Sequence, residues 1–195
     1  MPIGIYQRPG RSAGTSPTRF RSLRIYCTNR LFSIIPLTRC YGLKAAMLRC
    51  CGLQVSQSAR IVSSARIWGS VILTVGERSF IGHDALIIGG ESRVSIGSDV
   101  DIAARVCIET GTHAIDMIGP RSAGAGKSDD VTIEDGVWIG AATTILGGVT
   151  IGNKSIIGAG SLVNKDIPPF VIAVGVPCRP IKRWHPDSNT WRPIL

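Results

Sequence analysis

His113 is the residue of this chain best suited to proton transfer near neutral pH. It lies near the start of residues 111–130, a segment that is polar, rich in glycine and without a regular hydrophobic pattern. A neutral imidazole in such a loop can take the proton of a hydroxyl group, so His113 is a candidate general base. Asp116, three residues further on, could orient that ring or contact a substrate. A surface histidine without a role is the alternative interpretation.

The chain has two other histidines. His83, in the sequence IGHDA, falls within a repeat, and we expect its side chain to face outward. The alternative is that His83 lies at the edge of the functional site. His185 lies near the C-terminus beside Trp184, where a structural or solvent-exposed role is the expectation.

Two further features could hold a ligand. Trp138, in GVWIGAA, takes an outward position directly before an inward Ile139. An exposed tryptophan needs a partner, which could be a ligand or another subunit. Arg179, Lys182 and Arg183 form a basic cluster that would suit the phosphates of a nucleotide-bearing cofactor. A solvated basic tail is the alternative for this cluster.

The six cysteines have spacings typical of neither a disulfide framework nor a zinc site. We therefore expect reduced thiols in a cytoplasmic protein, no metal, and no cysteine placed to form a covalent intermediate.

The candidate residues are carried by a chain in which an aliphatic residue recurs at every sixth position. A helix or an alternating strand has no such period, but a chain that wraps a triangular column does, with one hexad on each face. The period is clearest in the second half of the chain and appears with small shifts in the first half. In the second half its members are Ile133, Ile139, Ile145, Ile151, Ile157 and Val163. In the first half they are Val55, Ile61, Ile67, Leu73, Val75, Ile81, Ile87, Ile96, Ile102 and Ile108.

About eighteen residues for each turn predict roughly five turns, stacked at about 4.8 Å. The predicted domain covers residues 53–195. The period stops over residues 111–130, which we expect to leave a corner as a long functional loop. Two prolines after Val163 end the coil, and a basic tail is predicted over residues 167–195.

Residues 1–52 form a separate N-terminal region. The formal net charge of the chain is +9, and residues 1–50 hold nine basic and no acidic residues. We predict an unstructured stretch over residues 1–17, for which an organellar address is the alternative, and helices over 18–35 and 37–51. These helices could cap the open end of the column or dock on a membrane surface. No apolar run is long enough to span a membrane, and no basic face on the repeat domain predicts nucleic-acid binding.

The sequence resembles a family, the hexapeptide-repeat acyltransferases, and within it the galactoside, maltose and polysaccharide O-acetyltransferases. The resemblance lies in VTIEDGVWIGAATTILGGVTIGNKSIIGAGSLVNKDIPPFVIAVGVPCRPIKRW, residues 131–184, and less tightly in VSIGSDVDIAARVCIETGTH, residues 94–113. It covers roughly the last hundred residues and none of the first fifty. It implies an all-β fold, a left-handed parallel β-helix, that assembles as a homotrimer with each site between two columns.

The resemblance also implies residue roles. His113 corresponds to the general base of such enzymes. Asn164 stands where relatives carry a hydroxyl residue, so one side-chain contact with acetyl-CoA differs from theirs. The residues implied to bind acetyl-CoA are Trp138, Ala141, Ala159, Asn164, Lys165, Arg179 and Lys182.

The resulting expectation is an acetyl-CoA-dependent O-acetyltransferase that acts directly on a saccharide or saccharide-lipid hydroxyl. Two alternatives use the same scaffold. One is a metalloenzyme like the γ-class carbonic anhydrases, which need three converging histidines, whereas this chain has no second histidine shortly after His113. The other is a non-catalytic scaffold. We expect a cytoplasmic protein, with contact at the inner membrane surface left open.

Overall fold

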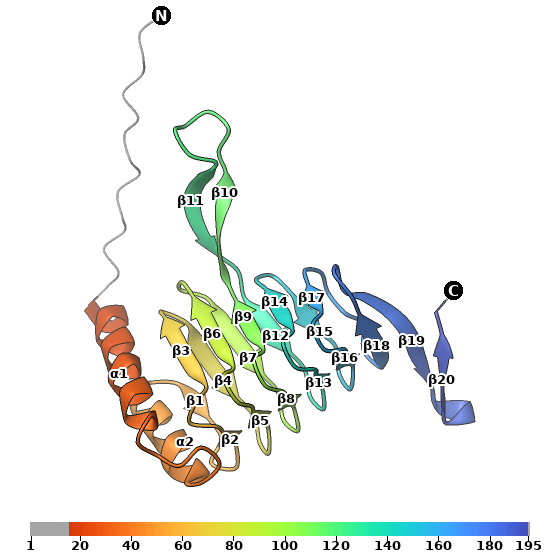
Figure 1. The fold of residues 1–195 in the computed structure, drawn as a ribbon, viewed down its shortest axis with the longest axis horizontal. Helices are drawn as coiled ribbons and strands as arrows, with labels where there is room; N and C mark the ends of the chain where they lie inside the picture. Colours follow the sequence, from red (N-terminus) through yellow and green to blue (C-terminus); the bar gives the residue numbers. More distant parts are fainter. Residues whose placement is uncertain (1–15, 195) are drawn as a thin grey trace, which may run out of the picture.

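The computed structural model describes residues 16–194, which form a column of stacked strands with two helices at one end (Figure 1). The helices are α1 (Ser16–Phe32) and α2 (Tyr41–Cys50). The two predicted helices are therefore confirmed, although α1 begins earlier and both end before the predicted residue. Pro36 lies between them and has no N–H to continue a helix. Residues 1–15 of the stretch predicted to be unstructured lie outside the described residues. The prediction was wrong for residues 16 and 17, which belong to α1.

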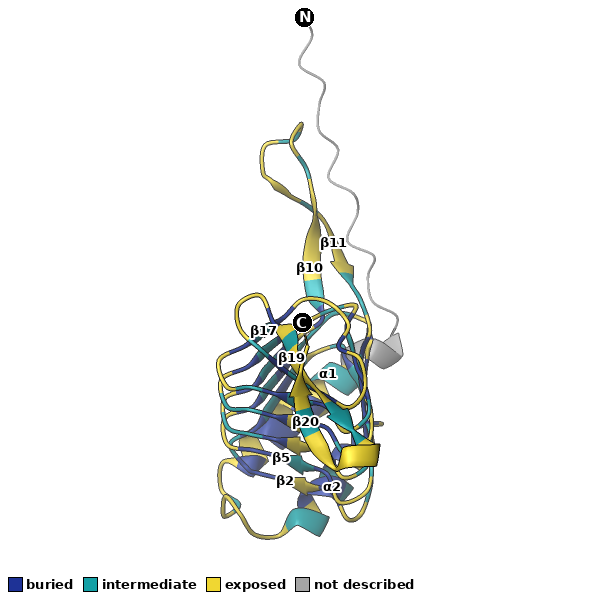
Figure 2. Ribbon diagram, turned by 90° about the vertical axis from the view of Figure 1, so that its right-hand side faces the viewer, coloured by how far each residue is buried: buried dark blue, intermediate teal, exposed yellow. Residues whose placement is uncertain are grey.

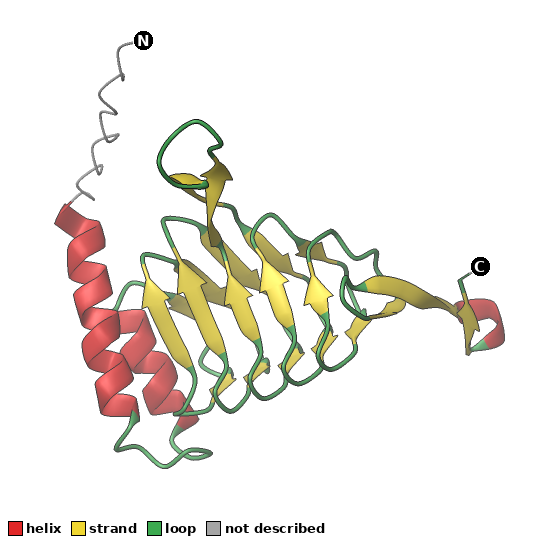
Figure 3. Cartoon of the chain, turned by 45° about the horizontal axis from the view of Figure 1, so that its top comes forward, coloured by secondary structure: helices red, strands yellow, loops and turns green. Residues whose placement is uncertain are grey.

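The column is built from three sheets that form its three faces, and their strands run parallel except for the last two strands of the second sheet (Figure 3). The first sheet contains β1 (Gln54–Val55), β4 (Ile72–Val75), β7 (Arg93–Ile96), β12 (Val131–Ile133) and β15 (Thr150–Ile151). The second contains β2 (Arg60–Ile61), β5 (Phe80–Ile81), β8 (Asp101–Ile102), β13 (Trp138–Ile139), β16 (Ile156–Ile157), β18 (Val171–Val174), β19 (Arg179–His185) and β20 (Thr190–Pro193). The third contains β3 (Arg66–Gly69), β6 (Leu86–Gly89), β9 (Cys107–Glu109), β14 (Thr144–Leu146) and β17 (Leu162–Val163).

The aliphatic residues of the six-residue period all point into the column, and each is at most 5% exposed. They stack in register from turn to turn, as Ile102 lies beside Ile139 and Ile139 beside Ile157. Burial of each such side chain contributes about 1.5–3 kcal/mol. The five predicted turns and the left-handed parallel β-helix are confirmed.

The chain turns three corners in each turn of the column. We call the connection from the first sheet to the second the first corner, that from the second to the third the second corner, and that from the third sheet to the next turn the third corner. Only the third corner varies in length. Val55 pairs with Val75 and Val75 with Ile96, repeats of 20 and 21 residues, whereas Ile133 pairs with Ile151 after 18. The small shifts in the sequence period all lie at this corner.

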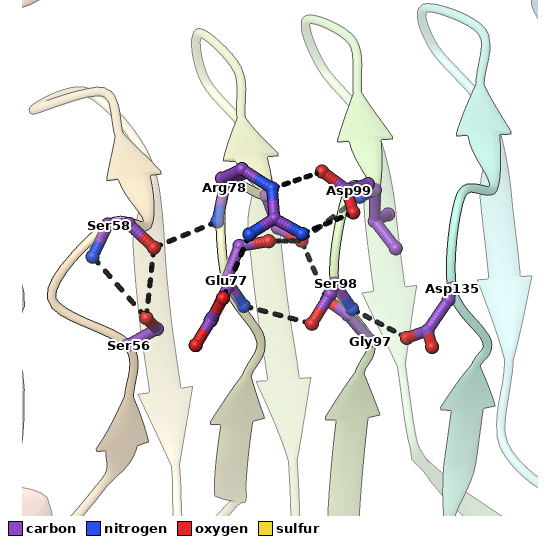
Figure 4. A network of polar contacts seen from close by, with 10 residues as sticks. Ser56, Ser58, Glu77, Arg78, Gly97, Ser98, Asp99 and Asp135 are labelled. Atoms are coloured by element: carbon purple, nitrogen blue, oxygen red, sulfur yellow. Dashed lines mark hydrogen bonds and ion pairs between the residues drawn. The ribbon is translucent and has the colours of Figure 1, made fainter.

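The first corner carries a polar network that links successive turns (Figure 4). The Arg78 guanidinium donates to both carboxylate oxygens of Asp99, each at 2.7 Å, and to Glu77 at 2.8 Å. The backbone N–H of Ser98 donates to Asp135 of the following turn at 2.7 Å. Hydrogen bonds from Arg78 and its positive charge hold the pKa of the Asp99 carboxyl below its ordinary value.

The helices cover the first turn of the column. α1 packs against β3, and α2 packs against β1 and β2. The Asn29 amide donates to the carbonyl of Ile67 at 2.7 Å, and Arg21 donates to the carbonyl of Ser70 at 2.7 Å. The N-terminal helices thus form a cap. None of the helices within residues 16–194 is long and apolar enough to cross a membrane.

The opposite end differs from the predicted tail. β18 continues the second sheet in parallel with β16, and the chain then folds back as β19 and β20, which pair antiparallel. A short 3₁₀ helix (Pro186–Ser188) joins these two strands. Trp184 and Trp191 pack edge to face across them, with ring centroids 5.3 Å apart. His185 lies half-buried at the end of β19.

Candidate active site

The long segment predicted as a loop leaves the third corner as a β-hairpin. It consists of β10 (Gly111–Ile115) and β11 (Ala123–Ser128), and it projects from the side of the column (Figure 2). His113 lies on β10 opposite Gly126. A Cβ added at Gly126 would meet nothing within 4 Å, so the strand opposite the imidazole carries no side chain and leaves open space.

A cluster of hydroxyl groups fixes the base of this hairpin to the column. The Ser92 hydroxyl donates to Thr110 Oγ1 at 2.6 Å, and Thr110 Oγ1 lies 3.4 Å from Ser128 Oγ. The N–H of Gly90 also donates to Ser128 Oγ at 3.0 Å. Ser92 and Thr110 are buried, and Gly89 has no Cβ because Thr110 occupies that space. The root of the strand that carries His113 is therefore held firmly.

His113 lines an open cavity of about 990 Å³ at the base of the hairpin. The walls come from α1, the ends of β6 and β9, and both hairpin strands. Two carboxylates and an ammonium group, with several hydroxyl and backbone groups, face this space. The polar side chains around His113 are Ser22, Ser70, Glu91, Glu109, Thr112, Lys127 and Ser128. Such a lining can exchange hydrogen bonds with the hydroxyl groups of a polar ligand.

Asp116 lies further out on the hairpin and is not among the residues that line this cavity. Its Oδ1 accepts the N–H groups of Ile118 at 2.9 Å and Gly119 at 2.8 Å. These backbone hydrogen bonds, from Gly119 first and Ile118 second, lower the pKa of the carboxyl. Asp116 thus shapes the hairpin tip, and its predicted contact with an acceptor stays a prediction.

A second group of predicted residues lies on the outer face of the second sheet. Trp138 is 55% exposed and pairs with Ile156, which pairs with Ile172 on β18. Ile172 in turn pairs with Lys182 on β19. Three strand spacings separate Trp138 from Lys182, or about 14 Å. The row therefore begins with an aromatic ring, continues over two isoleucines and ends at an exposed ammonium group.

Ala141 and Ala159 lie together at the second corner, close to this row. The Ala141 carbonyl accepts the N–H of Gly160 at 2.8 Å. Arg179, at the start of β19, is exposed and donates to the carbonyl of Cys178 at 2.7 Å. This part of the column therefore combines backbone groups at Ala141 and Ala159, the apolar surface of the row on the second sheet, and the positive charge of Arg179.

Asn164 and Lys165 lie elsewhere. They follow β17 at the third corner, and both are exposed. This places them on the edge of the column from which the hairpin leaves, two turns beyond its base.

The two groups do not meet within one chain. The hairpin leaves the third corner, whereas Trp138 and Lys182 lie on the second sheet, which is the opposite face of the column (Figure 2). A site that contains both His113 and Trp138 would therefore need two copies of the chain.

The remaining histidine and cysteine residues are dispersed. His83 is exposed in the turn between β5 and β6, away from the His113 cavity. Within residues 16–194 no three His, Cys, Asp or Glu side chains lie close enough to hold a metal ion. Burial raises the pKa of the Cys107 thiol, with a further contribution from Glu109, and burial also raises that of Cys178.

Sequence reasoning did not identify the residues that anchor and surround His113. The hydroxyl cluster was missed although Thr110 directly precedes the segment without a period and Ser128 lies near its end. Glu91 and Glu109 each lie near the end of a turn, so their approach to His113 depends on how the third corner folds.

Comparison with known proteins places the repeats in a family. Residues 130–165 match the bacterial transferase hexapeptide family (six repeats), and residues 72–110 match the hexapeptide repeat of succinyl-transferase. The galactoside O-acetyltransferase of Escherichia coli (strain K12) is 45% identical over 105 residues, which cover 54% of this chain and 51% of that protein. The chain thus aligns with about half the length of this curated relative.

Solved structures extend the likeness to most of the chain. A maltose O-acetyltransferase from Clostridium difficile 630 has 32% identity and a TM-score of 0.65, and the match covers 88% of this chain and 90% of that one. A galactoside acetyltransferase in complex with coenzyme A has 28% identity and a TM-score of 0.71, with 91% and 87% covered. The predicted family is confirmed, and the chain belongs to the hexapeptide-repeat acetyltransferases.

Proposed function

We propose that this protein transfers an acetyl group from acetyl-CoA to a hydroxyl group of a saccharide. The observation that carries the proposal is the placement of His113 on a cavity lined by hydroxyl, carboxylate and ammonium groups. A saccharide presents many hydroxyl groups, and such a lining can bind several of them at once. The likeness to galactoside and maltose O-acetyltransferases supports the same class of acceptor.

The proposed chemistry is direct transfer. Neutral His113 takes the proton of the acceptor hydroxyl while its oxygen attacks the thioester carbonyl carbon. A backbone N–H on the column would stabilise the oxyanion, and the thiolate that leaves recovers the proton from the imidazolium. The raised pKa values of Cys107 and Cys178 keep these thiols protonated, which argues against a cysteine-bound acetyl intermediate.

The outer row of the second sheet fits the donor. The apolar pantetheine arm can lie along Trp138, Ile156 and Ile172, and Lys182 at the end of that row can meet a phosphate. Arg179 lies on the same strand as Lys182. Lys182 provides a point charge and not the two-pronged contact of an arginine.

We further propose that the chain works as a homotrimer, with His113 of one copy facing Trp138 of the next. The separation of these residues on opposite sides of one column supports this assembly. A ring of three identical copies repeats one such contact three times and closes. We place the protein in the cytoplasm, where acetyl-CoA is available.

Donor binding and transfer can be measured separately. Acetyl-CoA at a hundred times its dissociation constant should stabilise the folded protein by about 2.7 kcal/mol in a thermal-shift assay. Incubation with a panel of saccharides should then give one product whose mass has increased by one acetyl group. A non-catalytic scaffold predicts neither result, and no stabilisation by acetyl-CoA would refute the proposal.

A complementation experiment tests the shared site. His113→Ala and Trp138→Ala chains should each be nearly inactive as pure trimers. If each site takes His113 from one copy and Trp138 from the next, every mixed trimer contains one intact site and regains roughly one third of wild-type activity. Mixed trimers without activity would show that both residues act within a single copy.

A further inference from the structure

Helix α1 has two apolar faces, of which the column covers only one. Ile25 and Phe32 are buried against the first turn, at 1% exposure each. On the other side, Phe20, Leu23 and Leu31 are 61%, 59% and 48% exposed. Together with exposed Cys27 they recur at spacings of three and four residues, which places them on one side of the helix. We call this set, Phe20, Leu23, Cys27 and Leu31, the outer face of α1.

Positive charge borders this outer face. Arg24 and Arg30 are exposed and lie on its two flanks. The Arg30 guanidinium lies 5.4 Å from the centre of the Tyr26 ring, so an aromatic side chain also stands at the border. The first fifty residues of the chain contain nine basic and no acidic residues, so no carboxylate opposes these charges within the region.

We propose that the outer face of α1 docks on an anionic lipid bilayer, with the helix axis parallel to the membrane surface. An apolar strip between arginines matches an interface in which acyl chains lie beneath negatively charged head groups. Burial of Phe20, Leu23 and Leu31 in the lipid boundary removes their apolar surface from water, while Arg24 and Arg30 remain at the phosphates. Ile34, 80% exposed just after α1, would extend the same contact.

The position of α1 makes this docking compatible with the rest of the molecule. The helix covers the end of the column, whereas the hairpin leaves its side (Figures 1 and 3). The His113 cavity lies at the base of the hairpin, and α1 contributes Ser22 to its wall, a residue outside the outer face. A membrane against the outer face would leave the hairpin and the second sheet free. If the trimer proposed above forms with parallel columns, three outer faces share one end and bind together, which multiplies a weak individual affinity.

Vesicle co-sedimentation of the full chain tests the docking. The wild-type protein should sediment with vesicles of phosphatidylcholine and phosphatidylglycerol, much less with pure phosphatidylcholine, and less as salt is raised. Leu23→Ser with Leu31→Ser should weaken binding to the anionic vesicles by roughly tenfold or more. Arg24→Gln with Arg30→Gln should weaken it by a similar factor and reduce the salt dependence.

A matched control uses the opposite end of the molecule. Ile194 is 40% exposed beside Arg192 on β20, and Arg192→Gln with Ile194→Ser should bind vesicles like the wild type. Circular-dichroism melting and size-exclusion elution should show that all variants are folded. The proposal fails if the wild type does not sediment with anionic vesicles, or if the α1 variants sediment as well as it does. It also fails if those variants change only the oligomeric state, because a second copy then covers the face.

None of these measurements uses catalysis. A protein that docks on vesicles but does not acetylate saccharides would contradict the proposed function and leave the docking surface intact. The reverse result would remove the docking surface alone.

Discussion

The first and third corners of the column both adjoin the first sheet but differ in the length and the contacts of their residues. At the first corner each turn uses the same number of residues, and side chains such as Arg78 and Asp99 link one turn to the next. At the third corner the repeat varies, and between Ile96 and its partner Ile133 the chain inserts the whole hairpin. One edge of the column therefore maintains the spacing of the turns, while another edge carries the candidate site.

The largest expected effect belongs to the third corner and would separate activity from stability. His113→Ala should lower turnover by roughly a hundredfold or more, because the acceptor hydroxyl loses its base. The unfolding free energy and the affinity for acetyl-CoA should remain near wild type, since the side chain is exposed. Steady-state kinetics and urea denaturation measure the two quantities. Unchanged turnover would remove His113 from the mechanism.

A second comparison uses two lysines. Lys182→Ala should raise the KM for acetyl-CoA about tenfold, because a charge-assisted hydrogen bond to phosphate is lost at a partly solvated site. Lys154 is an exposed lysine at the first corner, and Lys154→Ala is the matched control that should leave KM unchanged. The difference between the two variants should shrink as salt is raised. Equal KM values for both would assign the phosphates to other residues.

Hydroxyl groups at the two corners give a third test. Thr110→Val leaves the buried Ser92 hydroxyl without its acceptor, which should lower the unfolding free energy by about 1–3 kcal/mol. Ser79→Ala removes a comparable bond at the first corner, where the hydroxyl donates to the Gly97 carbonyl at 2.6 Å. Both should lose stability, but only Thr110→Val should also lower turnover several-fold, because Thr110 directly precedes β10, the strand that carries His113. Equal turnover of the two variants would show that the hairpin base does not position His113.

The smallest effect is the pH dependence of the first corner. The pKa of Asp99 is lower in the folded protein than in the unfolded chain, so its pairing with Arg78 stabilises the fold above the unfolded pKa and is lost as pH falls below about 4. Arg78→Ala should therefore cause a small loss of unfolding free energy near neutral pH that disappears in acid. Both side chains are more than half exposed and neither lines the His113 cavity, so the effect on stability should be small and activity should not change. Denaturation curves across this range check the prediction, and a loss that grows in acid would contradict it.

The column could be predicted from the sequence because its signal is local. Residues such as Ile139 and Ile157 lie six or eighteen positions from their equivalents, and each inward position demands the same kind of side chain. The same reasoning located the third-corner insertion, since the period stops there. It also singled out His113 within that insertion, and the structure places this residue in the wall of the cavity at the hairpin base. Its role as the base stays a prediction.

Other features depend on contacts that no period encodes. The spacing of His113 and Asp116 suggested a pair, but backbone N–H groups of Ile118 and Gly119 reach the carboxylate first. The predicted basic tail instead forms strands, because Val171 and Ala173 continue the inward row and β19 returns across them. The division of the candidate residues between opposite faces required the three-dimensional column.

The two ends of the column determine whether the strands of another chain can add to it. Stacked parallel strands expose an unpaired edge at each end, and such an edge can recruit another chain and grow into a fibre. Here α1 and α2 cover the first turn, while β19 occupies the free edge of β18. The outermost described strand, β20, ends in Pro193, which has no N–H to donate to a further strand. Within residues 16–194, both ends of the column are therefore covered against pairing with a further chain.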